Sequence, residues 1–182
     1  MRLHFSEAEL QARRARCCER MQEQGLDGLL MFRQESMFYL TGYDTFGYVF
    51  FQCLYLGADG RMMLLTRAPD MRQAELTSCV SDIRIWVDGP EANPAVELKG
   101  ILASFGCGGS TLGVEYEAYG LTARNGKRLE AALEGFCQLA DASGLVSEER
   151  VVKSPAEIAF VRRAGELADD AWAEAQSLTA AG

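Results

Sequence analysis

A short turn, Gly57-Ala58-Asp59-Gly60, constrains the fold of this 182-residue chain more than any other segment. It separates two runs rich in apolar residues, Val49 to Leu56 and Arg61 to Thr66. Its glycines and Asp59 are the residue types that a tight hairpin requires at positive φ. The two runs are therefore predicted to pair as antiparallel strands, and a purely parallel sheet is excluded.

Helices and strands are predicted to alternate on both sides of this hairpin. Helices are expected at Glu7 to about Gly25, Pro69 to Ser78, Pro94 to Phe105 and Ala123 to Glu134, and strands at Gly28 to Phe32, Ile83 to Val87, Leu112 to Glu115 and Cys137 to Asp141. Ser6, Asn93 and Thr122 occupy the N-cap positions of three of these helices. A hairpin inserted into such an alternation predicts an α/β domain with a mixed, partly antiparallel central sheet and helices on both faces.

The most strongly specified helix start lies near the end of the chain. Ser154 can cap the first free N–H groups, Pro155 suits the first helical position, and Glu157 completes a capping box. Apolar residues then recur at helical spacing as far as Ala175. We therefore divide the chain into a domain at residues 1–150 and a helix at 151–182, which either connects to a second domain or contacts another subunit.

Charge and hydropathy exclude several classes of function. Lys and Arg number 18 against 26 Asp and Glu, and the formal net charge of -8 argues against a surface that follows a phosphate backbone. The most apolar stretch, Val49 to Leu56, is far too short to span a bilayer, and the N-terminus does not have the pattern of a signal peptide. We expect a cytoplasmic protein with no nucleic-acid partner and no membrane partner.

Residues for metal or thiol chemistry are scarce in this sequence. The six cysteines are scattered without a C-x-x-C pair, and we predict that they are reduced packing residues. His4 is the single histidine, and the chain has no HExxH motif and no Asp-x-Asp cluster on which a divalent metal could assemble. We predict no catalytic residue and no metal ligand in this chain.

Two further segments have functional and structural interpretations. The glycine-rich run from Gly106 to Ser110 follows a predicted helix and precedes a strand, which is the reverse of the order in nucleotide-binding loops. Glu115 and Glu117, with Tyr116 and Tyr119 nearby, can be interpreted as an acid/base pair at a strand end. Without a histidine, a metal or a nucleophile, we interpret the two carboxylates as a solvated strand exit.

The segment Tyr43-Asp44-Thr45-Phe46-Gly47-Tyr48 is the strongest candidate for contact with a ligand. It places three aromatic residues and an acid around a glycine, between Thr41-Gly42 and a strongly apolar strand. Such a composition is unusual for a loop that only connects two elements. Either these rings line a pocket, or they fill a domain or dimer interface.

Three sequence blocks, taken in order, carry a family resemblance. They are Asp27-Gly28-Leu29-Leu30, Ser36-Met37-Phe38-Tyr39-Leu40-Thr41-Gly42-Tyr43 and Val152-Lys153-Ser154-Pro155-Ala156-Glu157-Ile158. With them the chain resembles the N-terminal domain of the creatinase, prolidase and aminopeptidase P family. The resemblance implies a creatinase/prolidase-type N-terminal domain at 1–150. It also implies a connector helix at 151–182 that leads toward a "pita-bread" catalytic domain beyond Gly182.

The same resemblance implies a metal-dependent hydrolase as the longer parent and an inactive chain when these residues stand alone. The family's ligands for a divalent metal pair (Mn, Co or Zn), which are two Asp, one His and two Glu, belong to the catalytic domain. The implied partners are that catalytic domain, a second copy in a homodimer, and a small peptide or amide substrate. The expected substrate is an Xaa-Pro dipeptide or a peptide N-terminus, and an ectoine hydrolase or creatinase-like amidohydrolase is the alternative.

The resemblance also implies a role for the aromatic segment. In the family, the corresponding loop reaches toward the catalytic pocket of the partner subunit, so four side chains would contact substrate: Tyr43, Asp44, Phe46 and Tyr48. Asp44 would meet a cationic end of the substrate. Creatine-cleaving members use an arginine where this chain has Phe50 and Phe51, which disfavours creatine itself. A non-enzymatic peptide- or histone-binding module is the alternative from another class, because relatives of this fold have lost the enzyme.

Overall fold

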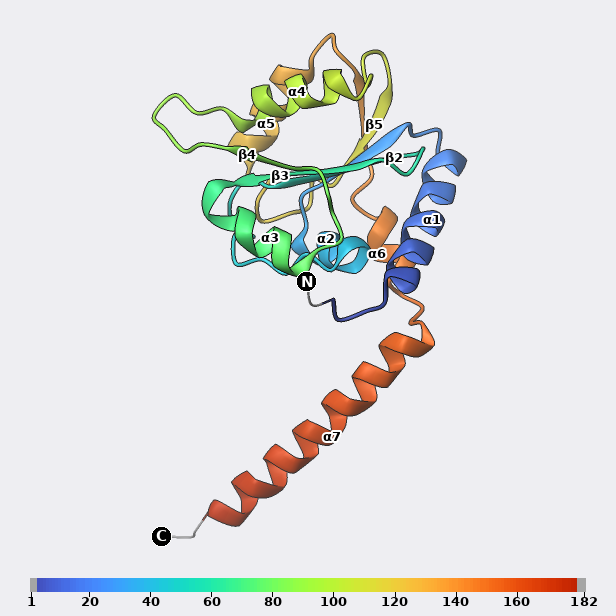
Figure 1. Cartoon of the computed structure of the whole chain (residues 1–182), viewed down its shortest axis with the longest axis vertical. Helices are drawn as coiled ribbons and strands as arrows, with labels where there is room; N and C mark the ends of the chain where they lie inside the picture. Colours follow the sequence, from blue (N-terminus) through green and yellow to red (C-terminus); the bar gives the residue numbers. More distant parts are fainter. Residues whose placement is uncertain (1–2, 180–182) are drawn as a thin grey trace. The chain divides into compact units, whose positions relative to one another are not determined.

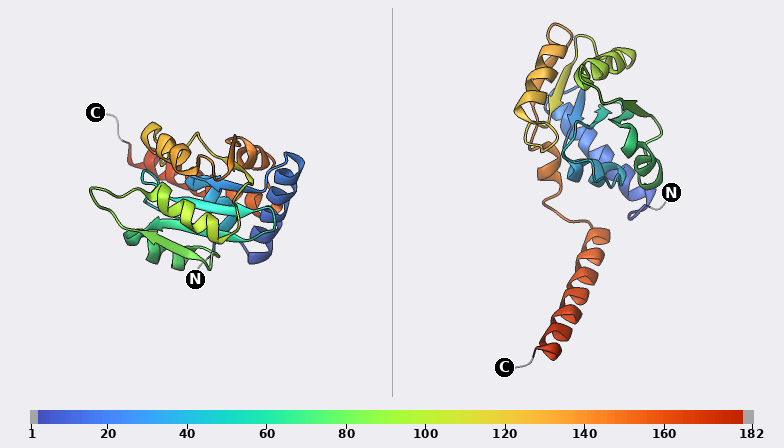
Figure 2. Two further views of the ribbon diagram at one scale, coloured as in Figure 1. Left: turned by 90° about the horizontal axis from the view of Figure 1, so that it is seen from above. Right: turned by 90° about the vertical axis from the view of Figure 1, so that its left-hand side faces the viewer.

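The structure of this chain is a computed structural model that describes residues 3–179 (Figures 1 and 2). It contains two units, one ending at Glu148 and one beginning at Glu149. The second unit contains α7 (Pro155–Leu178), which begins at the predicted residue. The predicted connector segment ends with residues 180–182, which lie outside the described residues.

A mixed six-stranded sheet forms the centre of the first unit, which confirms the predicted fold class. Its strand order is β4-β3-β2-β1-β5-β6, with β1 (Gly28–Met31), β2 (Cys53–Gly57), β3 (Met62–Arg67), β4 (Ile83–Trp86), β5 (Thr111–Val114) and β6 (Gln138–Asp141). β2 is antiparallel to both of its neighbours, β1 and β3, and the other three pairs are parallel. Among the described strands, β2 alone therefore starts at the edge where the other five end. We call this edge the carboxyl edge.

Helices cover both faces of this sheet, as predicted. The helices before α7 are α1 (Glu7–Glu23), α2 (Gln34–Thr41), the 3-10 turn η1 (Ala68–Asp70), α3 (Met71–Thr77), α4 (Pro94–Ser104), α5 (Ala123–Leu133) and α6 (Leu145–Glu149), whose last residue begins the second unit. Figure 1 shows α4 and α5 on one face and α1, α2, α3 and α6 on the other. Side chains from these two groups fall into two separate core clusters, one on each side of the sheet.

The central strands are buried on both faces because each contributes side chains to both clusters. In β1, Leu29 and Met31 belong to the cluster under α1 and α2, whereas Leu30 belongs to the cluster under α4 and α5. All four residues of β1 are buried. This explains why β1 has a continuously apolar sequence instead of an alternating one.

Local signals specified several helix starts correctly. The side chains of Ser6, Asn93, Thr122 and Ser154 each accept a hydrogen bond from a backbone N–H in the first turn of the helix that follows. At α7 the capping box is reciprocal, because the Ser154 N–H donates to Glu157 Oε2 at 2.9 Å. None of the helices in residues 3–179 combines the length and the hydropathy that a membrane span requires.

Two local predictions were wrong, and two helices were missed. The strand expected from Val49 begins at Cys53, because the Phe50 N–H donates to the Gly47 carbonyl at 2.9 Å and closes a turn ahead of the strand. In the hairpin turn, Gly60 has a positive φ of 83°, but Gly57 and Asp59 do not. Helices α2 and α6 were not predicted, and the N-cap residue of α2, Arg33, makes no side-chain capping bond.

Candidate functional site

The aromatic loop, residues 43–52, runs from the end of α2 to the start of β2 and reaches the carboxyl edge where it enters β2. Gly42 ends α2 in the left-handed region with a φ of 81°. The loop then follows α3, because the Asp44 N–H donates to Thr77 Oγ1 at 3.1 Å and the Phe46 N–H donates to Gln73 Oε1 at 3.4 Å. Ligand sites of open α/β sheets commonly lie at this edge.

A buried polar network fixes the base of the aromatic loop. The Tyr43 hydroxyl donates to Gln52 Oε1 at 2.7 Å and lies 3.3 Å from Thr66 Oγ1. The Gly47 N–H and the Gln52 side-chain amide both donate to Thr45 Oγ1, at 2.9 and 3.3 Å. Burial raises the pKa of Tyr43. The Tyr43 ring is therefore a structural anchor of the loop in this conformation.

The other three predicted contact residues lie at the surface. The side chain of Phe46 is 87% exposed, that of Tyr48 is 43% exposed, and Asp44 is exposed as well. The structure thus brings the four predicted residues into one loop but divides them into a buried anchor and three outward-facing side chains. Their contact with a substrate stays a prediction.

The loop is also held from the β3 and β4 side of the carboxyl edge. The Arg67 guanidinium lies over the Phe50 ring, 3.8 Å from its centroid, and pairs with Asp88 at 2.7 Å. The Trp86 indole N–H donates to the Phe51 carbonyl at 2.9 Å. The ends of two strands therefore fix the segment that leads into β2.

On the other side, the segment after β5 packs against the same loop. A Cβ at Gly120 would lie 2.5 Å from the Phe50 carbonyl oxygen and 3.2 Å from that of Tyr48, so only glycine permits this backbone approach. The Tyr119 and Tyr48 rings meet edge to face, with centroids 6.0 Å apart. The sequence interpretation left Tyr119 beside the Glu115 and Glu117 pair, because no local pattern predicts that it meets Tyr48.

Glu115 is a buried structural carboxylate, so its interpretation as part of a solvated strand exit was wrong. It accepts hydrogen bonds from the backbone N–H groups of Phe32 and Arg33, both at 3.1 Å, and from the Ser36 hydroxyl. Burial raises the pKa of Glu115, and these donors oppose that rise. Glu115 therefore holds the start of α2, while the exposed Glu117 pairs with Arg33 at 2.9 Å.

Asp70 lies beneath the aromatic loop with one oxygen that lacks a partner. Its Oδ2 is buried and makes no hydrogen bond within the described part of the chain. A Cβ at Gly47 would lie 2.8 Å from this oxygen, so the loop backbone passes directly over it. Burial raises the pKa of Asp70, and the charge of Arg67 opposes this effect.

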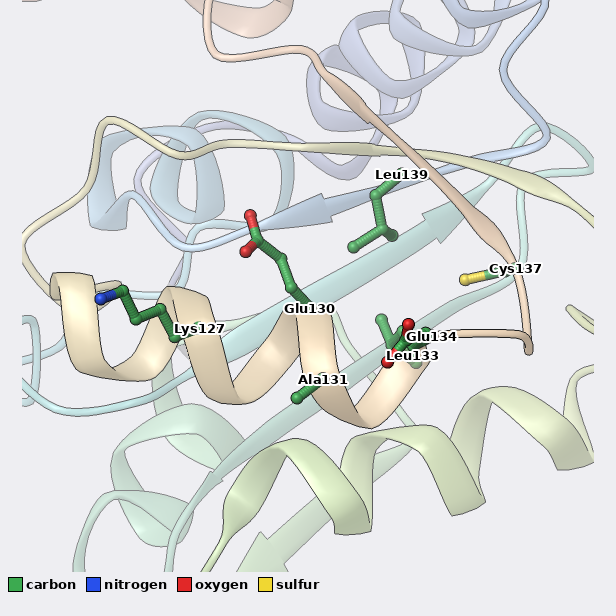
Figure 3. Close-up of a pocket in the computed structure, with 7 residues that line it drawn as sticks. All are labelled: Lys127, Glu130, Ala131, Leu133, Glu134, Cys137 and Leu139. Atoms are coloured by element: carbon green, nitrogen blue, oxygen red, sulfur yellow. The ribbon is translucent and has the colours of Figure 1, made fainter.

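Neither the potential metal ligands nor the hollow between α5 and β6 indicates a different functional site. Across residues 3–179, no group of three or more His, Cys, Asp or Glu side chains is arranged to hold a metal ion. All six cysteines are free thiols, as predicted. A hollow of about 450 Å³ between α5 and β6 is lined by Lys127, Glu130, Ala131, Leu133, Glu134, Cys137 and Leu139 (Figure 3). It includes none of the predicted contact residues, so the aromatic loop remains the candidate site.

Comparison with known proteins confirms the resemblance. Residues 13–152 match the family model described as the creatinase/prolidase N-terminal domain. The chain is 34% identical over 99% of its length to the uncharacterized hydrolase/peptidase y4tM of Sinorhizobium fredii, and the match covers 47% of that protein. It is 30% identical over 91% of its length to the ectoine hydrolase of Halomonas elongata, with 43% of that enzyme covered. The chain therefore spans about half the length of the curated relatives it matches.

A solved structure supports the same fold. The Xaa-Pro dipeptidase from Bacillus anthracis aligns with a TM-score of 0.76 and 20% sequence identity over 95% of this chain and 44% of the dipeptidase. At this identity the likeness concerns the fold alone. It agrees with the mixed sheet and the two helical layers described above.

Proposed function

This chain belongs to the creatinase/prolidase N-terminal domain family, and from that premise we propose that it is the non-catalytic N-terminal domain of a metal-dependent hydrolase. The parent would cleave Xaa-Pro dipeptides or the N-terminal residue of peptides. One observation carries the proposal, which is that the chain matches 47% of a hydrolase/peptidase over nearly its own full length. The other half of such a protein would hold the catalytic centre.

The potential metal ligands of this chain support the proposal that catalysis belongs to a second domain. The described residues offer no cluster of three or more potential metal ligands, so they do not fit the divalent metal pair that the family resemblance implies. We therefore assign the pair (Mn, Co or Zn) to a catalytic domain that follows α7, where it would activate water and polarise the scissile carbonyl. The 182-residue chain alone would be inactive.

The aromatic loop supports a role in closing the substrate pocket. Tyr43 fixes it from below, and Arg67 and Gly120 fix it from two sides, while Phe46 and Tyr48 point outward. A constrained loop with exposed rings loses little conformational entropy when it contacts a ligand. We propose that it lines the pocket of a catalytic domain, with Asp44 meeting a cationic substrate end.

Exposed apolar side chains support two proposed protein partners, which are the catalytic domain and a second copy of the protein. In α7, Phe160, Val161, Leu167 and Trp172 are each more than half exposed, which fits a helix that the proposed catalytic domain would cover. In the first unit, Phe46, Val49 and Phe50 are exposed on the aromatic loop. We propose that this loop also lies at a homodimer interface.

A second substrate class is supported by one observation. The ectoine hydrolase of Halomonas elongata is 30% identical over 91% of this chain. Ectoine is a compact cyclic amidine, so the parent would then hydrolyse a small non-peptide amidine. The same exposed carboxylate, Asp44, would meet the positive charge of either substrate.

The proposal is tested by reading the source gene past the codon for Gly182. We expect an open frame that encodes two Asp, one His and two Glu in that order. The chain and the longer protein are then assayed with Mn, Co or Zn on Xaa-Pro dipeptides and on ectoine, with activity expected only in the longer protein. A frame without those ligands, or a longer protein inactive on both substrates, would overturn the proposal.

The loop's role is tested separately in the longer protein. Asp44→Ala and Tyr48→Ala are expected to lower kcat/KM by about tenfold each, the effect of losing one contact with a charged group, without changing the metal content. Leu76→Ala on α3, also an exposed side chain, is the matched control and is expected to leave kinetics unchanged. Unaltered kinetics in both loop variants would remove the loop from the pocket.

A further inference from the structure

Two tyrosines from distant parts of the sequence form one aromatic surface at the carboxyl edge. Tyr119 is 77% exposed, and its ring stands edge to face with that of Tyr48, with an interplanar angle of 78°. We infer that Tyr119 and Tyr48 together contact a positively charged group of the substrate, which makes Tyr119 a specificity-determining residue. This inference rests on the proposed function, because it places the substrate at the aromatic loop.

Tyr119 is presented by a tight and well-anchored turn. The Leu121 N–H donates to the Ala118 carbonyl at 3.2 Å, and the Asn125 side-chain amide donates to the Gly120 carbonyl at 3.1 Å. Leu121, two residues beyond Tyr119, is buried in the core. An exposed aromatic ring on an anchored backbone contacts a ligand at a low cost in conformational entropy.

The turn and the aromatic loop keep a fixed spacing. The absent side chain of Gly120 allows its backbone to pack on the carbonyl oxygens of Tyr48 and Phe50. The two tyrosine rings therefore belong to backbones in direct contact, and neither segment can shift without moving the other. The pair acts as one surface, although Tyr48 lies in the aromatic loop and Tyr119 in the segment after β5.

The charges around this surface favour a cation as the ligand. Two arginines at this edge are already paired, Arg33 after β1 with Glu117 and Arg67 at the end of β3 with Asp88. Asp70 at this edge and Asp44 at the beginning of the aromatic loop make no ion pair within residues 3–179, so negative charge remains along the loop.

The faces of aromatic rings attract cations, and this edge already contains one such contact. Arg67 lies 3.8 Å from the centroid of Phe50. An ammonium or amidinium group of the substrate would make the corresponding contact with Tyr119 and Tyr48, whereas an anion would be repelled by the two free carboxylates.

The test is a substitution series at Tyr119 in the longer protein, assayed on an Xaa-Pro dipeptide and on ectoine. Tyr119→Phe keeps the ring, Tyr119→Leu keeps apolar bulk without a ring, and Tyr119→Ala removes both. For a cation–π contact we expect Phe to match wild type, while Leu and Ala both raise KM about three- to thirty-fold with little change in kcat. Val96→Ala on α4, another exposed side chain, is the control.

Each outcome is decisive. If Leu matches wild type, the contact is apolar and the cation is ruled out; if Ala matches wild type, Tyr119 does not contact the substrate. If the wild-type longer protein hydrolyses neither substrate, the proposed function has failed, and the inference falls with it. Thermal unfolding of the Ala variant separates folding from recognition, because a side chain this exposed is expected to leave the melting temperature unchanged.

Discussion

Glu115 and Asp70 are two carboxylates at the carboxyl edge of the sheet, and they differ in how they are bonded to the segments beside them. Glu115 lies next to the start of α2, and Asp70 lies beneath the aromatic loop. Glu115 is fully buried and accepts three hydrogen bonds, two from the backbone that leads into α2 and one from Ser36 in its first turn. Asp70 lies under the aromatic loop with a buried oxygen that no donor within residues 3–179 reaches. Burial raises the pKa of both groups, but specific donors oppose that rise at Glu115.

This difference indicates how firmly each segment is held. A buried carboxylate with three donors fixes the position of α2 strongly, because moving the helix would leave several buried polar groups unpaired. The aromatic loop depends instead on Tyr43, on close packing and on contacts at its rim. We expect α2 to be part of the rigid frame and the loop to be the more easily displaced segment.

Glu115→Ala is expected to have the largest effect, because it removes the acceptor of three buried donors. We expect a loss of about 3 kcal/mol in the free energy of unfolding of the first unit. Urea denaturation followed by Trp86 fluorescence, in a Trp172→Phe background, measures it. Glu117→Ala is the control and is expected to cost under about 0.5 kcal/mol, because its ion pair is exposed. Equal losses in the two variants would contradict the anchoring role of Glu115.

Tyr43→Phe is expected to have an intermediate effect. The variant keeps the buried ring but removes the hydroxyl that donates to Gln52, at a cost of about 1 kcal/mol. Hydrogen exchange at the Gly47 and Phe50 amides is expected to quicken more than exchange in β1. Tyr48→Phe serves as the control, since the Tyr48 side chain is partly exposed. Unchanged exchange in Tyr43→Phe would show that the loop does not depend on this network.

Asp70→Asn is expected to have the smallest effect, visible as a change in pH dependence. Below the ordinary aspartate pKa of about 4, the carboxyl group is neutral in both folded and unfolded chains. As the pH rises through the raised folded pKa, the folded chain must ionise a poorly solvated group, so wild type loses stability that Asp70→Asn retains.

Asp141 provides a control of opposite sign for this experiment. Its pKa is lowered by hydrogen bonds from Ser143, so its contribution is present at neutral pH and is lost as the pH falls through that lowered value. Melting temperatures measured from pH 3 to pH 8 should therefore change in opposite directions when Asp70 and Asp141 are each replaced by Asn. The same direction of change in both variants would refute the assignment for Asp70.

Features that depend on neighbouring residues were predictable from the sequence. The capping box at Ser154 and Glu157 specified the start of α7, and the mixed sheet followed from one hairpin within a strand–helix alternation. The family resemblance rested on three short blocks and is confirmed by the match over residues 13–152. In each of these cases the physical signal lies within a few residues of the structure that it specifies.

Features that depend on distant residues were missed. Helix α2 lacks a side-chain cap of its own and is held instead by Glu115, which is far away in the sequence. Likewise, the turn at Gly47 to Phe50 is fixed by contacts from Arg67 and Gly120, so its apolar composition alone suggested a strand. The sequence singled out the aromatic loop as the candidate site, but neither the burial of Tyr43 nor the pairing of Tyr48 with Tyr119 has a local signal.

The reversed direction of β2 determines which kind of connection lies at the carboxyl edge of the sheet. Because β2 begins at the carboxyl edge, the loop that precedes it joins a helix to a strand there, while the other end of β2 is fixed by the tight hairpin at Gly57 to Gly60. The length and composition of residues 43–52 can therefore change without altering any crossover helix. One inverted strand thus gives the domain a helix-to-strand connection at its carboxyl edge, beside the connections that leave the other five strands there.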